Sequence, residues 1–183
     1  MTILFTVMKL DAGNIIVQER TKIGPSETAG ALTDRYFRLG AELLPRALAA
    51  LEDPAFRGTP QDESKVTVCR KIDKQDGLVD WTCTAEDCVN RFRAFEPWPG
   101  TYTFLSGRRI ALTDLTLDDH DKSSLAPGEV VFDKQHHCLN VGTGEGVVRV
   151  AKLKPAGGKE LQAPAFWNGL KDRSRVVFNN VGV

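Results

Sequence analysis

Two strand-like segments stand near the start of the chain. Residues 2–8 are nearly all apolar and β-prone, and residues 14–23 begin with the apolar, β-branched Ile15, Ile16 and Val17. These patterns predict two strands, the first of them covered on both faces because it carries so few polar positions. A strand of that kind needs a neighbour on each side. Met1 directly precedes it, so we expect part of its sheet to come from sequence outside this chain.

The next segment has its apolar residues at helical spacing. They are Leu32, Tyr36, Leu39, Leu43, Ala47 and Leu51. This spacing predicts an amphipathic helix over residues 29–52 that packs on the sheet. Ser26 or Thr28 is its expected N-cap, and Pro45 is expected to kink or divide it.

Proline, glycine and charged residues dominate the segment that follows. Residues 53–82 read as an extended linker between domains. A second amphipathic helix is predicted over residues 84–95, with Thr84 as its N-cap. It runs into Arg93-Ala-Phe-Glu-Pro-Trp-Pro-Gly100, where two prolines flank a tryptophan. Such a segment is neither a helix interior nor a central strand, so we expect an ordered hinge between domains with Trp98 as its packed pivot.

Beyond Gly100 the pattern changes to short strands separated by turn residues. The predicted strands are 101–105, 108–117, 129–132, 137–141 and 147–153. Five short strands in so few residues favour a small barrel of the oligonucleotide-binding (OB) type, with residues 164–170 as a closing helix. The Gly142–Gly146 loop could be a phosphate loop or a hairpin turn. The turn is favoured because no Lys-Ser/Thr pair follows it.

Composition places the chain among soluble globular proteins, with 42% hydrophobic and 26% charged residues. No apolar run is long enough to span a membrane and the start does not read as a signal peptide, so a cytoplasmic location is expected. The net charge is zero, yet residues 146–183 hold 7 basic and 2 acidic residues. Such an excess predicts either a polyanion-binding face or a solvated basic tail.

Four cysteines occur at positions 69, 83, 88 and 138. In a cytoplasmic protein they are expected to be reduced thiols rather than disulfides. Cys83, Cys88 and the His136-His137-Cys138 run could be imagined as zinc ligands. Their spacing matches no familiar zinc motif, so no metal is expected.

The Arg93–Gly100 segment resembles the Arg-Ala-Phe-Asn-Pro-Trp-Pro-Gly signature of methionyl-tRNA formyltransferases, with Glu96 in place of asparagine. Four further motifs in the same order resemble segments of that family. They are Leu10-Asp-Ala-Gly13, Val79-Asp-Trp81, Val141-Gly-Thr-Gly-Glu-Gly146 and Phe166-Trp-Asn-Gly169. Two departures are Val68-Cys69, where the family has Tyr-Ala, and Leu170, where a basic residue is common.

The resemblance implies an α/β fold followed by a β barrel. Residues 1–57 would be the tail of a Rossmann-like formyltransferase domain, 58–95 a linker with its helix, and 96–183 an OB-like, five-stranded tRNA-binding domain. The chain would correspond to the C-terminal three-fifths of the family. The folate-binding loop and the Asn and His of the catalytic Asn-His-Asp set would then lie outside it.

The implied reaction transfers a formyl group from 10-formyltetrahydrofolate to the amino group of methionyl-initiator-tRNA in translation initiation. An oxyanion must be stabilised and a proton moved between nitrogens. By position Asp11 is the remaining catalytic residue, although an aspartate before glycine is, taken alone, more often a turn residue. The histidines stand at 120, 136 and 137, none at the expected position. We therefore expect the chain alone to be inactive.

The resemblance also implies contacts to the tRNA phosphates. The expected contacts are Lys71, Lys74, Arg93, Arg149, Lys152, Lys154, Lys159, Asn168 and Lys171. Taken singly, each is more often a solvated surface residue. Two other functions stay open, namely a non-catalytic RNA-binding module and a folate-dependent formyltransferase or hydrolase acting on a small molecule. No membrane and no protein partner are expected.

Overall fold

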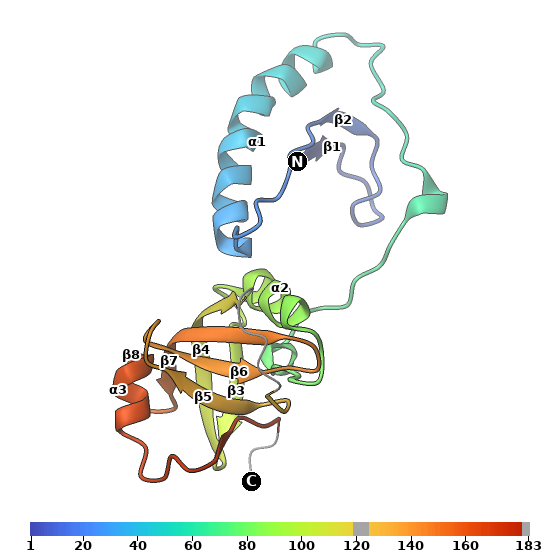
Figure 1. Ribbon diagram of the computed structural model, residues 1–183. Helices are drawn as coiled ribbons and strands as arrows, with labels where there is room; N and C mark the ends of the chain where they lie inside the picture. The colour runs from blue at the N-terminus through green and yellow to red at the C-terminus, as the bar shows by residue number, and fades with distance from the viewer. Residues whose placement is uncertain (119–124, 181–183) are drawn as a thin grey trace. The chain divides into compact units, whose positions relative to one another are not determined.

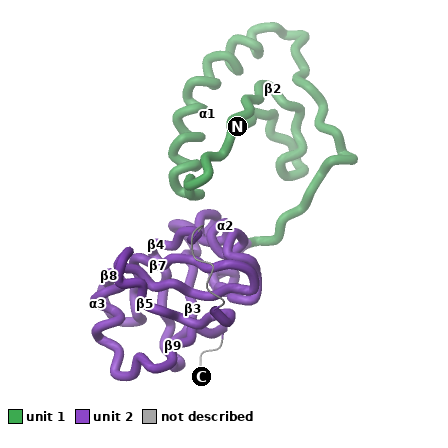
Figure 2. Tube along the Cα trace, viewed as in Figure 1, with its two compact units in different colours: residues 1–71 green, residues 72–183 purple. Residues whose placement is uncertain are grey.

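The computed structural model describes residues 1–118 and 125–180, and the chain divides into two compact units. Unit 1 comprises residues 1–71 and unit 2 begins at Ile72 (Figure 2). The boundary therefore falls at Lys71–Ile72 and not at the proline-rich motif, which lies inside unit 2. Each unit is described by itself below.

Unit 1 contains a small two-stranded sheet and one long helix. Strands β1 (Thr2–Leu4) and β2 (Ile15–Gln18) pair antiparallel, and both are shorter than predicted. Helix α1 (Ala29–Leu51) contacts both strands. Its N-cap is Thr28, whose side chain accepts a hydrogen bond from the Ala31 backbone N–H. The helix runs through Pro45 without a break, so the expectation that the proline could divide it is wrong.

Apolar residues are poorly covered in unit 1. Helix α1 fully buries only Leu43 and Ala47, both of which belong to the predicted apolar stripe. Other apolar residues of α1 stay exposed. They are Phe37, Leu44, Leu48 and Leu51. The short 3-10 helix η1 (Glu63–Lys65) follows, and every residue from 62 to 71 is exposed. Unit 1 thus has secondary structure but little core.

Unit 2 is a barrel-like antiparallel sheet with two helices packed on it (Figure 1). It opens with the 3-10 helix η2 (Lys74–Gly77) and helix α2 (Ala85–Phe95). The long strands are β3 (Thr101–Leu105), β4 (Arg108–Leu117), β5 (Glu129–Asp133), β6 (Cys138–Gly142) and β7 (Val147–Pro155). Strand β8 (Leu161–Gln162), helix α3 (Ala163–Asn168) and strand β9 (Val176–Val177) complete the unit. All five predicted strands are confirmed, but the sheet has seven strands rather than the predicted five, because β8 and β9 add to it.

The strand order β3-β4-β7-β6-β5-β9 brings the two ends of the sheet together. Phe104 on β3 and Asn179 after β9 exchange backbone hydrogen bonds of 3.0 and 2.9 Å. These bonds nearly close the sheet and leave few unpaired strand edges. Strand β8 pairs with β7 outside this path. The β6–β7 connection is a hairpin turn, as predicted, in which the Thr143 N–H donates to the Gly146 carbonyl at 3.1 Å.

The core of unit 2 recruits residues that precede the barrel. Trp81 is 2% exposed, its ring stacks on Phe178 with centroids 6.0 Å apart, and its indole N–H donates to Thr103 Oγ1 at 3.0 Å. Val79 and the Val89 face of α2 belong to the same core. The end of the segment predicted to be a linker is therefore packed into the barrel.

The proline-rich motif is a tight turn between α2 and β3. The Gly100 N–H donates to the Phe95 carbonyl at 2.9 Å, and Gly100 has a φ of +72°, a conformation that favours glycine. The Glu96–Pro97 and Trp98–Pro99 peptide bonds are both cis. Trp98 is 56% exposed, so the expectation that it is a packed pivot is wrong.

Candidate nucleic-acid interface

A row of basic side chains follows the outer surface of strand β7. Val148, Val150 and Leu153 are fully buried, whereas Arg149 and Lys152 are half-buried and Lys154 is exposed. Strict alternation would place Arg149 on the opposite face from Lys152 and Lys154, but the pairing with β4 shifts register between Leu112 and Leu115, opposite Leu153 and Val150. On both sides of this irregularity the apolar side chains are buried, and the three basic side chains stay at least partly exposed.

Arg149 is held in place by a buried carboxylate. Its Nε and Nη2 donate to Asp118 Oδ2 and Oδ1 at 2.9 and 2.7 Å, and the Asp118 side chain is only 1% exposed. Asn140 lies directly opposite Arg149 on β6, and its Nδ2 is 3.5 Å from Asp118 Oδ2. A bidentate pair of this kind fixes the guanidinium geometry. Arg149 is thus held in an ion pair within the barrel, in contrast to Lys152 and Lys154.

Two aromatic residues lie on strand β3, which β4 separates from this basic row; Tyr102 is buried and Phe104 is half-buried. The Arg109 guanidinium carbon is 3.8 Å from the centroid of the Tyr102 ring, and Tyr102 meets Phe104 edge-on at 5.7 Å. Ala111 pairs with Tyr102 on one side and with Lys154 on the other. Cation–π stacking keeps the arginine flat against the barrel. Interleaved basic and aromatic side chains are typical of surfaces that bind nucleic acid.

Sequence reasoning missed Arg108 and Arg109, although a signal was present. The two arginines follow the Ser106–Gly107 turn at the start of β4. Adjacent strand residues point to opposite faces, so one of the pair had to lie outside the barrel and the other at its open end. Arg109 pairs with Phe104 and Arg108 with Leu105.

The remaining predicted contacts in unit 2 lie on other elements. Lys159 is exposed in the turn between β7 and β8, and Asn168 and Lys171 are exposed at the end of α3. Lys74 is exposed on η2. Arg93, in the last turn of α2, donates to Asn90 Oδ1 at 3.0 Å and is half-buried. Only Arg149, Lys152 and Lys154 share one strand.

Asp11 occupies a turn of unit 1 between β1 and β2. Its φ of +53° is a left-handed conformation that aspartate tolerates, and its carbonyl accepts a hydrogen bond from Gln61 Nε2 at 2.7 Å. The carboxylate is exposed. A cavity of about 490 Å³ lies beside this turn and is lined by Ala12, Gly13 and the aromatic rings of Phe5 and Phe56.

No histidine lies in unit 1, since the three occur at positions 120, 136 and 137. His136 Nδ1 pairs with Asp133 Oδ2 at 2.6 Å in the β5–β6 turn, and this contact lowers the pKa of Asp133. His137 is in the same turn. His120 lies outside the described residues.

Comparison with known protein families identifies the larger part of the chain. A family model described as "Formyl transferase, C-terminal domain" matches residues 71–171, more than half of the chain. The chain belongs to the formyl transferase family. All nine predicted tRNA contacts fall inside the matched region, and Asp11 falls outside it.

Curated relatives of this formyl transferase chain are named methionyl-tRNA formyltransferase. The protein of Bdellovibrio bacteriovorus is 37% identical over 179 residues, which cover 97% of this chain and 55% of the relative. The proteins of Brucella canis and Brucella abortus are each 39% identical over 164 residues, covering 87% of this chain and 51% of theirs. The chain therefore spans about half the length of these relatives.

Solved structures of HypX from Aquifex aeolicus share the fold. One variant of HypX has a TM-score of 0.69 at 21% identity and covers 94% of this chain and 32% of HypX. HypX in complex with tetrahydrofolic acid also has a TM-score of 0.69, at 19% identity, covering 97% of this chain and 33% of HypX. At this identity the likeness concerns the fold.

The residues of unit 1 fit part of a folate. The cavity beside Asp11 offers two aromatic walls, with the Phe5 and Phe56 rings 6.5 Å apart and tilted by 38°. Its polar side chains are Thr6, Asn14 and Arg57. Asn14 Nδ2 donates to the Arg57 carbonyl at 2.7 Å, and Arg57 Nη1 donates to the Pro54 and Phe56 carbonyls at 2.6 and 3.0 Å. A flat apolar ring system therefore finds contact surface there, while its hydrogen-bonding edge finds few free partners among the described residues.

The cysteines differ sharply in environment. Cys69 and Cys83 are exposed, whereas Cys88 and Cys138 are buried. Burial raises the pKa of the Cys88 thiol to about 12 and also raises the pKa of Cys138. The described residues contain no group of three His, Cys, Asp or Glu that could hold a metal ion. Nor does any described helix have the length and hydrophobicity to cross a membrane.

Proposed function

We propose that this chain is part of a methionyl-tRNA formyltransferase and that unit 2 holds the tRNA. The observation that carries the proposal is the basic row on β7, inside the region that matches the family. Phosphate contacts from lysine and arginine supply most of the affinity for nucleic acid. Lys152 and Lys154 are the best placed, because Arg149 is already paired with Asp118.

The remaining contacts extend this surface in the proposal. Lys159 follows β7, Asn168 and Lys171 lie at the end of α3, and Lys71 and Lys74 flank the start of unit 2. The substrate in this proposal is methionyl-tRNA, as the names of the relatives suggest, and specifically the initiator form that the sequence motifs imply. The location is the cytoplasm, where translation begins.

Salt-dependent binding of methionyl-tRNA tests the proposal. We expect the double substitution Lys152→Gln, Lys154→Gln to weaken binding and to reduce the slope of log affinity against log salt by about 2, one for each phosphate that the variant no longer neutralises. Lys71→Ala, Lys74→Ala is expected to act in the same direction. The measurement is filter binding between about 50 and 200 mM salt.

The matched control neutralises Lys22 and Lys65 in unit 1, which removes the same charge from a different place. It should leave the salt slope close to that of the unchanged chain. Two results would contradict the proposal that unit 2 binds RNA. One is an affinity that does not change with salt concentration, and the other is an equal loss of affinity from the Lys152/Lys154 and the Lys22/Lys65 substitutions.

For the reaction we propose that 10-formyltetrahydrofolate supplies the formyl group. Asp11 would orient a histidine and help to move the proton released by the attacking amino group. Its exposed carboxylate beside an aromatic-walled cavity is consistent with this role. An aspartate alone provides neither the oxyanion contact nor the proton donor, and unit 1 contains no histidine.

We therefore expect no formylmethionyl-tRNA when the 183-residue chain is incubated alone with 10-formyltetrahydrofolate and methionyl-tRNA. Product is measured by acid-resistant label on the tRNA. Turnover above the no-enzyme background would contradict this expectation. If turnover occurred and Asp11→Asn left it unchanged, the catalytic role of Asp11 would be rejected as well.

A further inference from the structure

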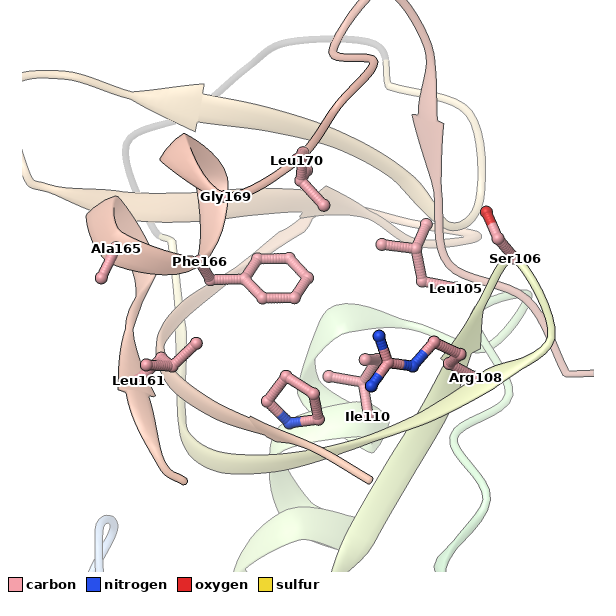
Figure 3. Close-up of a pocket in the computed structure, with 10 residues that line it drawn as sticks. Leu105, Ser106, Arg108, Ile110, Leu161, Ala165, Phe166, Gly169 and Leu170 are labelled. Carbon is pink, nitrogen blue, oxygen red and sulfur yellow. The ribbon is translucent and has the colours of Figure 1, made fainter. Parts of the chain in front are cut away.

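A cavity opens at one end of the barrel, between the β3–β4 turn and helix α3. Its volume is about 300 Å³, and its lining is mainly apolar. Figure 3 shows Phe166 and Arg108 extending into it from opposite sides, with Leu105, Leu161 and Leu170 around them. The cavity therefore combines apolar walls with one cationic group.

The depth of this cavity comes from buried residues of the core. Ile110 is 3% and Phe166 is 6% exposed, so both form the floor. Leu105, Leu161 and Leu170 are half-buried and form the walls. Apolar surface that faces water gains free energy when a ligand covers it, and concave apolar sites with few polar groups are typical of ligand binding.

Positive charge gathers at the mouth. The Arg108 guanidinium makes one long hydrogen bond within the described part of the chain, from Nη2 to the Ala156 carbonyl at 3.4 Å. An adjoining recess shares Leu105 and Leu170 with the cavity and adds Lys171 and Arg175.

The same recess includes one carboxylate, that of Asp172. Its Oδ1 accepts from the Ser174 N–H at 2.8 Å and from Ser174 Oγ at 2.7 Å, and these bonds hold its pKa below the usual range. Three cations against one internally bonded carboxylate favour an anionic group at the mouth.

Strand β7 connects this cavity to the proposed phosphate contacts. Pro155 lines the cavity and directly follows Lys154, the last basic residue of the row. A polyanion bound along Lys152 and Lys154 would therefore be led to the mouth of the cavity. The matching ligand has a flat apolar body and a phosphate attached to it.

We propose that this cavity binds one unpaired base of the RNA, with the base against Phe166 and its phosphate at Arg108. The proposal rests on the RNA-binding function proposed above and adds a specific site to it. One base stacked on an aromatic side chain contributes about 1–3 kcal/mol to binding single-stranded RNA. A duplex has no free base to insert and gains nothing from the cavity.

Two substitutions in the full chain test the site. Ala165→Trp fills the cavity from an exposed position of α3, and Arg108→Gln removes its cation. The matched control is Gln135→Trp in the β5–β6 turn, which adds the same bulk at an exposed position that does not line the cavity. The probes are a short oligoadenylate that carries 2-aminopurine, an RNA duplex of equal length, and adenosine monophosphate alone.

We expect Ala165→Trp and Arg108→Gln to weaken oligoadenylate binding about tenfold and to abolish the 2-aminopurine quenching, while Ala165→Trp leaves duplex binding within about twofold. Gln135→Trp should behave like the unchanged chain. Adenosine monophosphate should shift the NMR signals of Phe166 and Leu161, and Ala165→Trp should remove these shifts.

The outcomes separate the two proposals. Salt-dependent RNA binding that Ala165→Trp leaves unchanged overturns the base site alone. Failure of the unchanged chain to bind any RNA overturns the proposed function. Adenosine monophosphate that causes no shift at Phe166, or shifts that survive in Ala165→Trp, overturn the base site whether or not RNA binds.

Discussion

Basic residues on the surface of this barrel have different roles, and the role of each depends on whether a carboxylate lies close enough to pair with it. Arg149, Lys152 and Lys154 form one row along β7, yet Arg149 alone has a buried carboxylate within reach. A charge removed from water must be paired, and Asp118 is almost completely buried. The main role of the Arg149–Asp118 pair is therefore to stabilise the barrel.

We expect Asp118→Ala and Arg149→Ala each to lower the free energy of unfolding by about 3 kcal/mol, because each breaks an ion pair whose carboxylate is buried. Urea denaturation of the purified chain measures this. The double substitution should cost clearly less than the sum of the two single effects. A change below about 0.5 kcal/mol for either single variant would show that solvent screens the pair as it does at the surface.

This pair also changes how RNA binding by an Arg149 variant is interpreted. A weaker complex of Arg149→Ala could reflect a perturbed barrel as well as the removal of a phosphate ligand. Lys152 and Lys154 have no hydrogen-bond or ion-pair partner among the described side chains, so their substitutions report on the surface more directly. For Arg108 and Arg109, the sequence shows two adjacent arginines. Only the structure shows that Arg109 stacks on Tyr102 while Arg108 lines the cavity.

At the scale of elements, helix α2 links the start of unit 2 to the barrel. Its N-terminus contacts the β6–β7 turn, where the Ala85 N–H donates to the Glu145 carbonyl and the Gly144 N–H donates to the Cys83 carbonyl, both at 2.8 Å. A Cβ atom on Gly144 would lie 1.9 Å from the Thr82 carbonyl oxygen. Only glycine permits this approach.

The N-cap of α2 is expected to contribute measurably to stability. Thr84 Oγ1 accepts from the Asp87 N–H at 3.1 Å and donates to Asp87 Oδ2 at 2.8 Å. Thr84→Ala should lower the free energy of unfolding by about 1 kcal/mol, and Thr84→Ser, which keeps the hydroxyl, should recover most of it. The two variants are compared by urea denaturation. Equal stability of alanine and serine at this position would argue against the cap.

At the scale of the whole molecule, the two units differ in how well they bury apolar surface. The nineteen-residue core cluster belongs entirely to unit 2, and its strands are paired almost all the way round. Unit 1 fully buries few side chains and leaves large apolar residues of α1 exposed. Stability follows buried apolar area, so unit 2 is the more resistant part of the chain.

Limited trypsin digestion of the folded chain tests this difference. We expect the first cuts at Lys65, Arg70, Lys71 or Lys74, which lie in an exposed stretch between the units, and a resistant fragment that begins near Ile72. Mass spectrometry of the products identifies the sites. Early cuts at Arg149 or Lys152 inside β7 would show instead that the barrel opens as easily as unit 1.

Local patterns were sufficient to predict the five long strands and the two α-helices of unit 2, but not η2, β8 or β9. Turn residues such as Ser106-Gly107 and the Gly142–Gly146 loop separate the strands, and Thr84 marks a helix start by a hydrogen bond that spans only three residues. Such features depend on neighbours along the chain. The same holds for the turn at Asp11, whose conformation aspartate and glycine tolerate.

Long-range contacts were decided by tertiary structure alone. That Trp81 enters the barrel core, that Trp98 stays exposed, and that Asp118 pairs with Arg149 all depend on residues far apart in sequence. The cavity between Arg108 and Phe166 exists because β7 pairs with β4 and also contacts α3. The sequence by itself determined the family and the order of elements, because motifs and turn chemistry are local. Burial, pairing and cavities arise only when the sheet nearly closes.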